Sequence, residues 1–93
     1  MRITISICHS AQVRRACTSI PTNIAEGCGR GSSVEFARFL QIAMGSASET
    51  EYLIFLSHDL KYIDDKQYKD LSNQIIKIKK MLATLIKKIR TEE

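Results

Sequence analysis

YKDLSNQIIKIKKMLATLIKKI, residues 68–89, has apolar residues that recur at intervals of three and four. These intervals are those of the a and d positions of a heptad repeat. They put one apolar stripe along a helix, where it can pack against other helices. The stretch therefore predicts a helix in a bundle, with a stripe formed by Tyr68, Leu71, Ile75, Ile78, Leu82, Leu85 and Ile89.

The other faces of this helix are cationic. Seven lysines and one arginine lie between residues 66 and 90, and Asp70 is the one acidic residue among them. Lysine neutralises phosphates without reading bases, so we expect sequence-tolerant binding to RNA or DNA that weakens as salt rises. The alternative is an ordinary solvated helix face. The predicted nucleic-acid-binding residues on this helix are Lys69, Lys77, Lys80, Lys87 and Lys88.

Arg14 and Arg15 form a second cationic element in an earlier helix. They lie opposite its apolar stripe and so are expected to face outward. The planar guanidinium suits bidentate contact with phosphate, which favours a nucleic-acid-binding role. The alternative is pairing with an acid such as Glu49 or Glu51, and the sequence favours neither.

Composition bounds the class of protein. The chain has 93 residues and a formal net charge of +4, which is one small domain with a preference for anionic partners. No apolar run approaches the roughly 20 residues of a membrane span. Cys8, Cys17 and Cys28 lack paired metal-ligand spacing, as expected of thiols in a reducing compartment. We predict a cytoplasmic protein without metal, cofactor or membrane partner.

The earlier helix is predicted from about Ser10 to Cys28. Its stripe of Val13, Cys17, Ile20, Ile24 and Cys28 keeps phase through Pro21. A proline can either begin a new helix or kink a continuous one, and the unbroken phase favours a kink.

A second helix is predicted from about Ser33 to Tyr62. Ser32 and Glu35 read as a capping box at its start, and Asp64–Asp65 is expected to cap the helix that follows. Its broad apolar surface predicts burial by a fourth helix or between subunits. Its predicted inner face is Phe36, Phe39, Leu40, Ala43, Ala47, Ile54 and Leu60.

These segments predict an all-α protein, an antiparallel up-and-down helical bundle of three helices. The bundle domain is expected to occupy residues 10–93, after an irregular N-terminal segment of residues 1–9.

Residues 10–27, SAQVRRACTSIPTNIAEG, are followed by Gly29-Arg30 and by Glu35-Phe36-x-x-Phe39-Leu40-x-x-Ala43-x-Gly45-Ser46-x-x-Glu49. This pattern closely resembles the four-helix-bundle proteins encoded in intervening sequences of bacterial 23S rRNA genes. They are ribosomal-protein-like and related to the accessory variability determinant of diversity-generating retroelements. The resemblance extends from Ser10 to the C-terminus.

The resemblance implies a four-helix protomer, usually assembled as a homopentamer. It also implies a basic surface, which in the retroelement members engages RNA and a reverse transcriptase. Family members carry a whole helix before the segment that matches Ser10, so we expect this chain to lack most or all of the first helix. Within the matched segments we expect Glu26 and Glu49 to form buried ion pairs with Arg14, Arg30 or Arg38. The residues assigned to structure or interface are Pro21, Asn23, Glu26, Arg30, Phe39, Gly45, Ser46 and Glu49.

Catalysis is not predicted. The glycine-rich loop at residues 27–32 meets neither the Walker nor the dinucleotide-binding pattern. His58–Asp59 and the carboxylates form no identifiable nucleophile–base arrangement. We therefore expect a non-enzymatic, RNA-associated scaffold that oligomerises through apolar helix faces. The alternatives are a protein–protein adaptor, for example for a reverse transcriptase, and a truncated remnant without function.

Overall fold

The computed structural model describes the backbone of residues 11–91 and the side chains of residues 15–91. Within this part of the chain there are three helices, α2 (Ala11–Cys28), α3 (Ser33–Asp59) and α4 (Asp65–Thr91), and no strand. The predicted all-α bundle of three helices is confirmed. The predicted irregular segment 1–9, with Cys8, lies outside the described residues.

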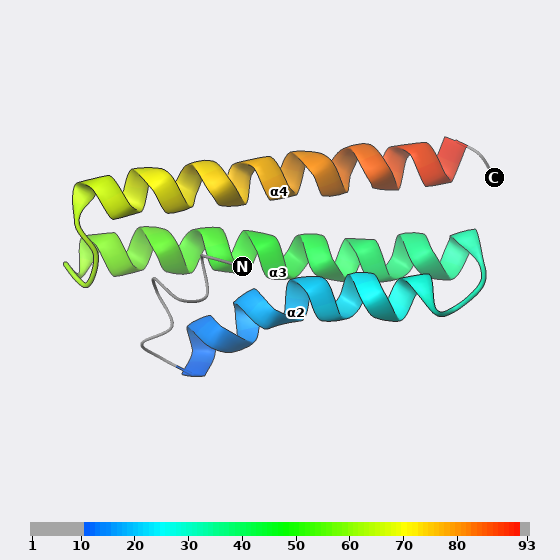
Figure 1. Ribbon diagram of the computed structural model, residues 1–93, viewed down its shortest axis with the longest axis horizontal. Helices are drawn as coiled ribbons and strands as arrows, with labels where there is room; N and C mark the ends of the chain where they lie inside the picture. The colour runs from blue at the N-terminus through cyan, green and yellow to red at the C-terminus, as the bar shows by residue number, and fades with distance from the viewer. Residues whose placement is uncertain (1–10, 92–93) are drawn as a thin grey trace.

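Successive helices run antiparallel, and α3 lies between the other two (Figure 1). Both α2 and α4 pack extensively on α3 but make only minimal contact with each other. Because the connections are short, each helix lies beside the helix that follows it. One side of α3 is therefore shared by two neighbours, and a gap opens between α2 and α4.

The core runs along the shared side of α3. On α4 the predicted stripe residues Leu71, Ile75, Leu82 and Ile89 are buried, whereas Leu85 is 37% exposed and its neighbour Ile86 is buried in its place. A straight α-helix drifts by about 20° per heptad, and this drift turns Leu85 out and Ile86 in. On α3, Leu60 was wrongly placed in the core and is exposed. The largest fully buried side chains are Leu40, Ile54, Leu71, Ile75, Thr50 and Cys17.

Pro21 lies inside a continuous α2, as the phase of the apolar stripe predicted. Proline has no N–H and therefore cannot bond the carbonyl four residues earlier. Neighbouring side chains bond other carbonyls in this stretch: Oγ1 of Thr22 donates to Thr18 at 2.8 Å, and Nδ2 of Asn23 donates to Ser19 at 2.8 Å. The N-terminal half of α2 diverges from α3 in Figure 1.

The turn between α2 and α3 uses Gly31 and Ser32. Gly31 has φ +78°, a conformation in which a side chain would be strained. Ser32 caps α3 by accepting a hydrogen bond from the Glu35 amide at 3.2 Å. The Glu35 carboxylate turns instead toward Arg38, 3.5 Å away, so the expected capping box is observed only in its serine half.

The turn between α3 and α4 begins earlier than predicted. Helix α3 ends at Asp59, and the next residues form a Schellman motif in which the Tyr62 amide bonds the Ser57 carbonyl at 2.9 Å and the Lys61 amide bonds the His58 carbonyl at 3.0 Å. This motif needs a left-handed residue, which is Lys61 with φ 65°.

Asp64 caps α4, as predicted, and does so reciprocally with Gln67. The Gln67 amide donates to Oδ1 of Asp64 at 2.7 Å, and the Asp64 amide donates to Oε1 of Gln67 at 3.0 Å. This arrangement is a capping box. None of the helices in the described residues is long and apolar enough to cross a membrane.

Candidate nucleic-acid interface

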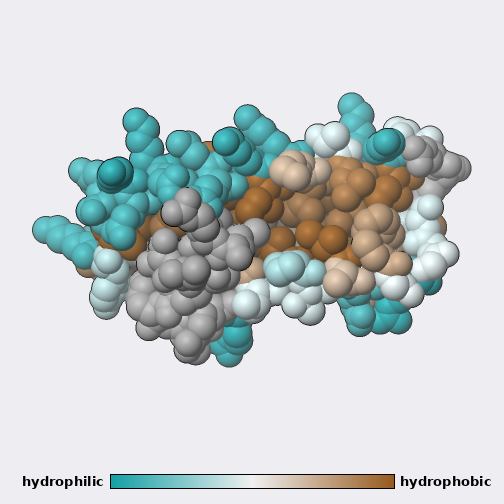
Figure 2. Space-filling view, viewed as in Figure 1, coloured by the Kyte–Doolittle hydropathy of each residue, from teal (hydrophilic) through white to brown (hydrophobic). Residues whose placement is uncertain are grey.

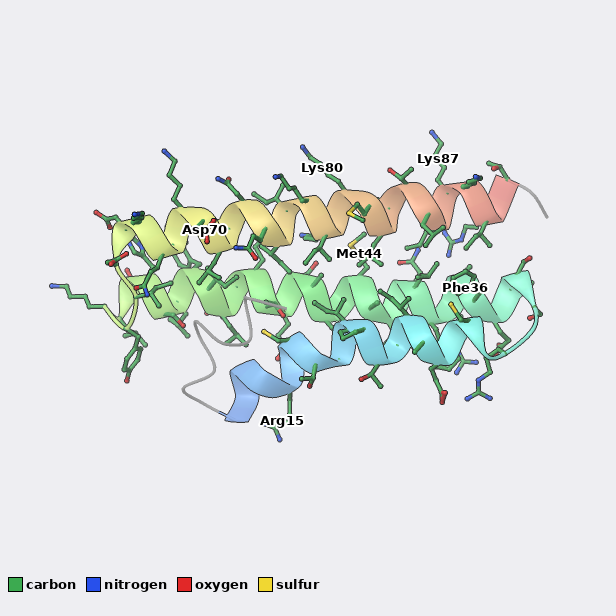
Figure 3. The ribbon with its side chains drawn as sticks, in the orientation of Figure 1. Arg15, Phe36, Met44, Asp70, Lys80 and Lys87 are labelled. Carbon is green, nitrogen blue, oxygen red and sulfur yellow. The ribbon has the colours of Figure 1, made fainter. Side chains whose placement is uncertain are left out.

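The outer surface of α4 carries the predicted lysines. Because the buried positions of α4 face α3, positions on the opposite side of the helix meet solvent. Lys80 and Lys87 point away from α3 (Figure 3), and hydrophilic residues line the same edge of the molecule in Figure 2. We call this surface the lysine face; it consists of Lys69, Lys77, Lys80, Lys87 and Lys88, all exposed.

In the described part of the chain, two acidic side chains at α4 have partners outside the lysine face. Glu51 of α3 accepts a hydrogen bond from Nζ of Lys79 at 2.8 Å, and Asp70 accepts one from Gln74 at 3.0 Å. In the described part of the chain, no residue of the lysine face forms an ion pair. Their ammonium groups are therefore available to external anions.

The lysine face is long enough to meet several phosphates. Lys69 and Lys88 are 19 residues apart, which is about 28 Å along a helix. Duplex nucleic acid presents a dense row of charge over this length. An arrangement of ammonium groups without base-reading side chains can bind a phosphate backbone and cannot select a sequence.

Arg15 does not extend the lysine face. It is exposed on α2 and points away from the bundle at the opposite edge from Lys80 (Figure 3). It lines a shallow depression together with Ser19, Ser46 and Glu49, but Glu49 forms no ion pair with it within 4 Å. The side chain of Arg14 lies outside the described residues.

Asn23 and Ser46, both assigned to structure or interface, are linked through Ser19 at the α2–α3 contact. Nδ2 of Asn23 donates to Oγ of Ser19 at 2.9 Å, and this hydroxyl lies 2.7 Å from Oγ of Ser46. The chain of bonds joins the two helices through small side chains. It gives the serine and asparagine on either side of Pro21 a physical role.

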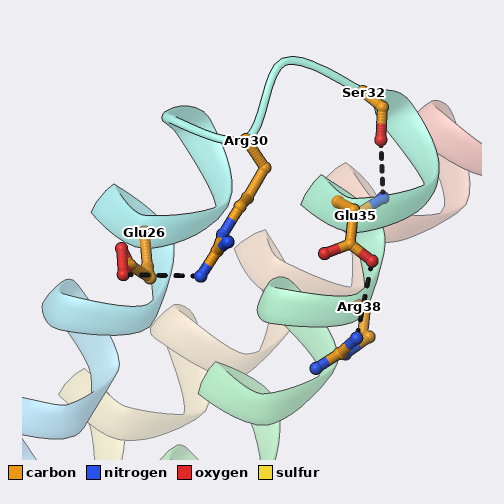
Figure 4. A network of polar contacts seen from close by, with 5 residues as sticks. All are labelled: Glu26, Arg30, Ser32, Glu35 and Arg38. Atoms are coloured by element: carbon orange, nitrogen blue, oxygen red, sulfur yellow. Dashed lines mark hydrogen bonds and ion pairs between the residues drawn. The ribbon is translucent and has the colours of Figure 1, made fainter.

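A second polar cluster surrounds Phe39 at the α2–α3 turn. Arg30 and Arg38 lie over its ring, at 5.1 and 5.6 Å from the centroid, which is cation–π distance. Each arginine also approaches a carboxylate, Arg30 that of Glu26 at 3.7 Å and Arg38 that of Glu35 at 3.5 Å (Figure 4). The expected partner of Glu26 is thus present, but both side chains are about half exposed, so the expectation of a buried ion pair was wrong. Glu49 is exposed, and it forms no ion pair with any described side chain.

Gly45, which was assigned to structure or interface, and Gly27 have different surroundings. A Cβ atom on Gly27 would lie 2.9 Å from Phe36 and from Phe39, whereas one on Gly45 would meet nothing within 4 Å. The close approach between α2 and α3 therefore occurs at Gly27. Gly45 lies on the outer side of α3 and is open in this protomer.

His58 pairs with a residue other than its sequence neighbour Asp59. Its Nε2 lies 2.6 Å from Oδ1 of Asp65, and its ring stacks on Tyr68 with centroids 4.3 Å apart. These contacts brace the α3–α4 turn. Among the described residues, no three His, Cys, Asp or Glu side chains are grouped so as to hold a metal ion.

Two features escaped the sequence analysis. The Lys79–Glu51 pair joins residues 28 positions apart, and no local spacing signals it. The second is an apolar groove between α2 and α4, which is lined in part by Ile78 and Leu85, two residues that the heptad pattern assigned to the packed stripe.

Comparison with known proteins places these observations in a family. The model of the 23S rRNA-intervening sequence proteins matches residues 6–84. None of the curated proteins compared with the chain matches it. The fold is similar to the crystal structure of a protein of unknown function from the S23 ribosomal protein family of Bacteroides thetaiotaomicron, with a TM-score of 0.79 and 38% identity. That similarity covers 82% of this chain and 68% of the other. The resemblance to intervening-sequence proteins is confirmed, and the relation to the retroelement determinant stays a prediction.

Proposed function

Because the chain belongs to the 23S rRNA-intervening sequence protein family, we propose that it is a non-enzymatic, RNA-associated scaffold. It binds phosphate backbones through the lysine face and self-associates through apolar helix surface. The observation that carries the proposal is the availability of five exposed lysines on one helix, none paired with an acid in the described part of the chain.

Binding is electrostatic in this mechanism. Each lysine that neutralises a phosphate releases condensed counterions, and the release drives association. Since lysine does not discriminate between bases, structured RNA of any sequence is a ligand, and DNA binds by the same contacts. Selectivity for a particular RNA then has to come from its shape or from a further protein.

A salt titration tests the proposal. A fluorescein-labelled RNA hairpin is titrated with the protein, and anisotropy is followed between about 50 and 200 mM salt. Three to five phosphate contacts predict that log K falls with log salt at a slope of about −3 to −4.5, on the duplex coefficient. Absence of binding at the lowest salt would refute RNA association through this surface.

Self-association is assigned to the outer face of α3. Ile42, Tyr52 and Phe55 are exposed there, and Gly45 between them is open to a close neighbour. This helix contains no lysine, so pairing two copies through it does not bring lysine faces together. An oligomer would repeat the lysine face and strengthen weak phosphate contacts.

Native mass spectrometry tests self-association with a matched pair of variants. Phe55→Ser is expected to shift the assembly toward the monomer. Met81→Ser removes an exposed apolar side chain from another helix, α4, and should leave the subunit number unchanged. A monomeric wild-type protein, or equal effects of the two variants, would contradict the assignment to α3.

A protein–protein adaptor, for instance for a reverse transcriptase, is the second candidate function. The apolar groove between α2 and α4 favours it, because monomeric proteins rarely leave such a surface unoccupied.

A further inference from the structure

Two arginines converge on one aromatic ring at the α2–α3 end of the bundle. The guanidinium carbons of Arg30, in the turn, and Arg38, in α3, lie over the Phe39 ring at 5.1 and 5.6 Å from its centroid. Close packing at Gly27 brings the end of α2 to this ring, since a Cβ atom on Gly27 would lie 2.9 Å from Cβ of Phe39. We call Arg30, Arg38 and Phe39 the arginine–phenylalanine cluster.

The guanidinium groups of the cluster keep most of their hydrogen-bonding capacity. Arg30 approaches Glu26 at 3.7 Å and Arg38 approaches Glu35 at 3.5 Å (Figure 4). Both distances are longer than the roughly 2.8 Å of a strong charge-assisted hydrogen bond. A guanidinium has several N–H donors in one plane, so a single long contact leaves most of them for a ligand. The side chains of Arg30 and Arg38 are 49% and 66% exposed, and a ligand can reach both.

The charge of the site favours a neutral planar ligand over a bare phosphate. Glu26 and Glu35 balance the two arginines, so these four side chains carry no net formal charge. A phosphate would be attracted by the guanidinium groups and repelled by the carboxylates. A nucleobase carries no charge to be repelled, and unpaired bases stack on guanidinium planes and on aromatic rings. At the edge of a stacked base, the guanidinium groups can donate hydrogen bonds and the carboxylates can accept them.

The cluster lies at the same end of the bundle as the last part of the lysine face. Figure 1 shows the α2–α3 turn and the C-terminal end of α4 at one end of the molecule, and Lys87 lies near that end (Figure 3). The bundle measures 22 Å in its second dimension, and about six nucleotides of a strand span roughly 20 Å. A strand that leaves a duplex bound on the lysine face can therefore reach the cluster within a few nucleotides.

We propose that the arginine–phenylalanine cluster binds an unpaired base in a single-stranded extension of the bound RNA. The base stacks on the exposed guanidinium surfaces, while the phosphates of the duplex stay on the lysine face. This inference rests on the proposed function and names its substrate class, which is duplex RNA with a single-stranded end. It also supplies a selectivity for RNA shape that the lysine face lacks.

Three RNA duplexes test the proposal by fluorescence anisotropy with the full chain at one salt concentration. All share about 12 base pairs, a length greater than that of the lysine face. The first is blunt, the second ends in a fork of about six unpaired adenosines on each strand, and the third has the same fork built from abasic nucleotides. The two forks carry equal numbers of phosphates, so the difference between them reports the bases. The adenosine fork is expected to bind about ten-fold more tightly than the abasic fork.

Matched substitutions locate the bound base. Arg30→Lys with Arg38→Lys retains both charges and their attraction to the Phe39 ring but removes the planar guanidinium surfaces. This double variant should bind the blunt duplex as the wild-type protein does and should lose the preference for the adenosine fork. Arg90→Lys makes the same exchange at an exposed position near the C-terminal end of α4 and should keep the preference. Thermal unfolding checks the folding of each variant, and the comparison of the two forks in the wild-type protein needs no variant.

The outcomes separate this inference from the proposed function. Equal affinity of the wild-type protein for the two forks would overturn the base site, and binding of the blunt duplex would then leave the lysine face as the RNA-binding surface. Preference for the adenosine fork without binding of the blunt duplex would support the base site and contradict binding through the lysines. Full preference in the double variant would place the base elsewhere. Tighter binding of free adenosine monophosphate than of the adenosine fork would identify a soluble nucleotide, not RNA, as the ligand.

Discussion

Nζ of Lys79 lies 2.8 Å from Oε1 of Glu51, which joins α4 to α3 by a half-buried ion pair. The pair connects the two helices at one relative height. It also removes one lysine of α4 from those that can meet an external phosphate.

A double-mutant cycle on Lys79→Gln and Glu51→Gln should yield a coupling free energy of about 0.5 kcal/mol, because the pair is only partly shielded from water. Urea unfolding measures this coupling free energy. Glu51→Gln alone should tighten RNA binding slightly by freeing Lys79. An additive cycle, with no coupling, would mean that the ion pair does not persist in solution.

Removing charge from the lysine face should weaken RNA binding without loss of stability. The triple change Lys77→Gln, Lys80→Gln and Lys87→Gln affects exposed side chains, so the melting temperature should stay nearly constant. The salt slope should become shallower by about 2 to 3. Anisotropy with the RNA hairpin measures both affinity and slope.

Lys79→Gln is the matched control for this series, because it changes the same residue type on the same helix. The ammonium group of Lys79 is already paired with Glu51. Lys79→Gln should therefore change the salt slope by less than any one of the three substitutions in the triple variant. If the control and Lys77→Gln have equal effects, the lysine face does not act as a defined surface.

The sequence predicted the helices well because their apolar periodicity is strong, and it failed where packing chooses between adjacent residues. Leu71, Ile75 and Leu82 were placed in the core correctly. Leu85 and Ile86 are both apolar, and a heptad count favours the first while the drift of a straight helix favours the second. The end of α3 was missed because a lysine, Lys61, holds the left-handed position that usually signals itself by glycine.

For the candidate site, the exposure of the lysines could be predicted from the sequence, but their ion pairs with acidic residues could not. Lys80 and Lys87 lie opposite the apolar stripe, so their exposure follows from helical geometry. Whether a given lysine meets an acid depends on the register of α4 against α3, which the sequence pattern leaves undetermined. The ion pair between Lys79 and Glu51 is a consequence of that register. The groove beside Leu85 depends on the same packing choice.

Lys61→Gly should stabilise the protein. The residue holds φ 65°, which costs a residue with a Cβ about 1 kcal/mol or more relative to glycine. Lys69→Gly is the control, since glycine in the interior of an exposed helix costs about 1 kcal/mol. Urea unfolding should therefore show shifts of opposite sign. A loss of stability at both positions would contradict the left-handed turn.

Gly27→Ala and Gly45→Ala should also shift stability in opposite directions. At Gly27 the new methyl group would lie 2.9 Å from Cβ of Phe39 and from Cδ1 of Phe36. The Phe36 ring can rotate, but Cβ of Phe39 is fixed to the α3 backbone, so the helices must separate. Overpacking of this kind costs about 1 to 3 kcal/mol, which exceeds the gain of up to about 1 kcal/mol from helix propensity.

At Gly45 an added Cβ atom would have nothing within 4 Å. Gly45→Ala should therefore raise the free energy of unfolding by the full gain in helix propensity, up to about 1 kcal/mol. Both substitutions are glycine to alanine within a helix, so the difference between their unfolding free energies isolates the α2–α3 contact. Measurement at low protein concentration keeps any assembly through α3 from contributing. Equal gains at both positions would show that α2 does not approach Phe39 as closely as the geometry requires.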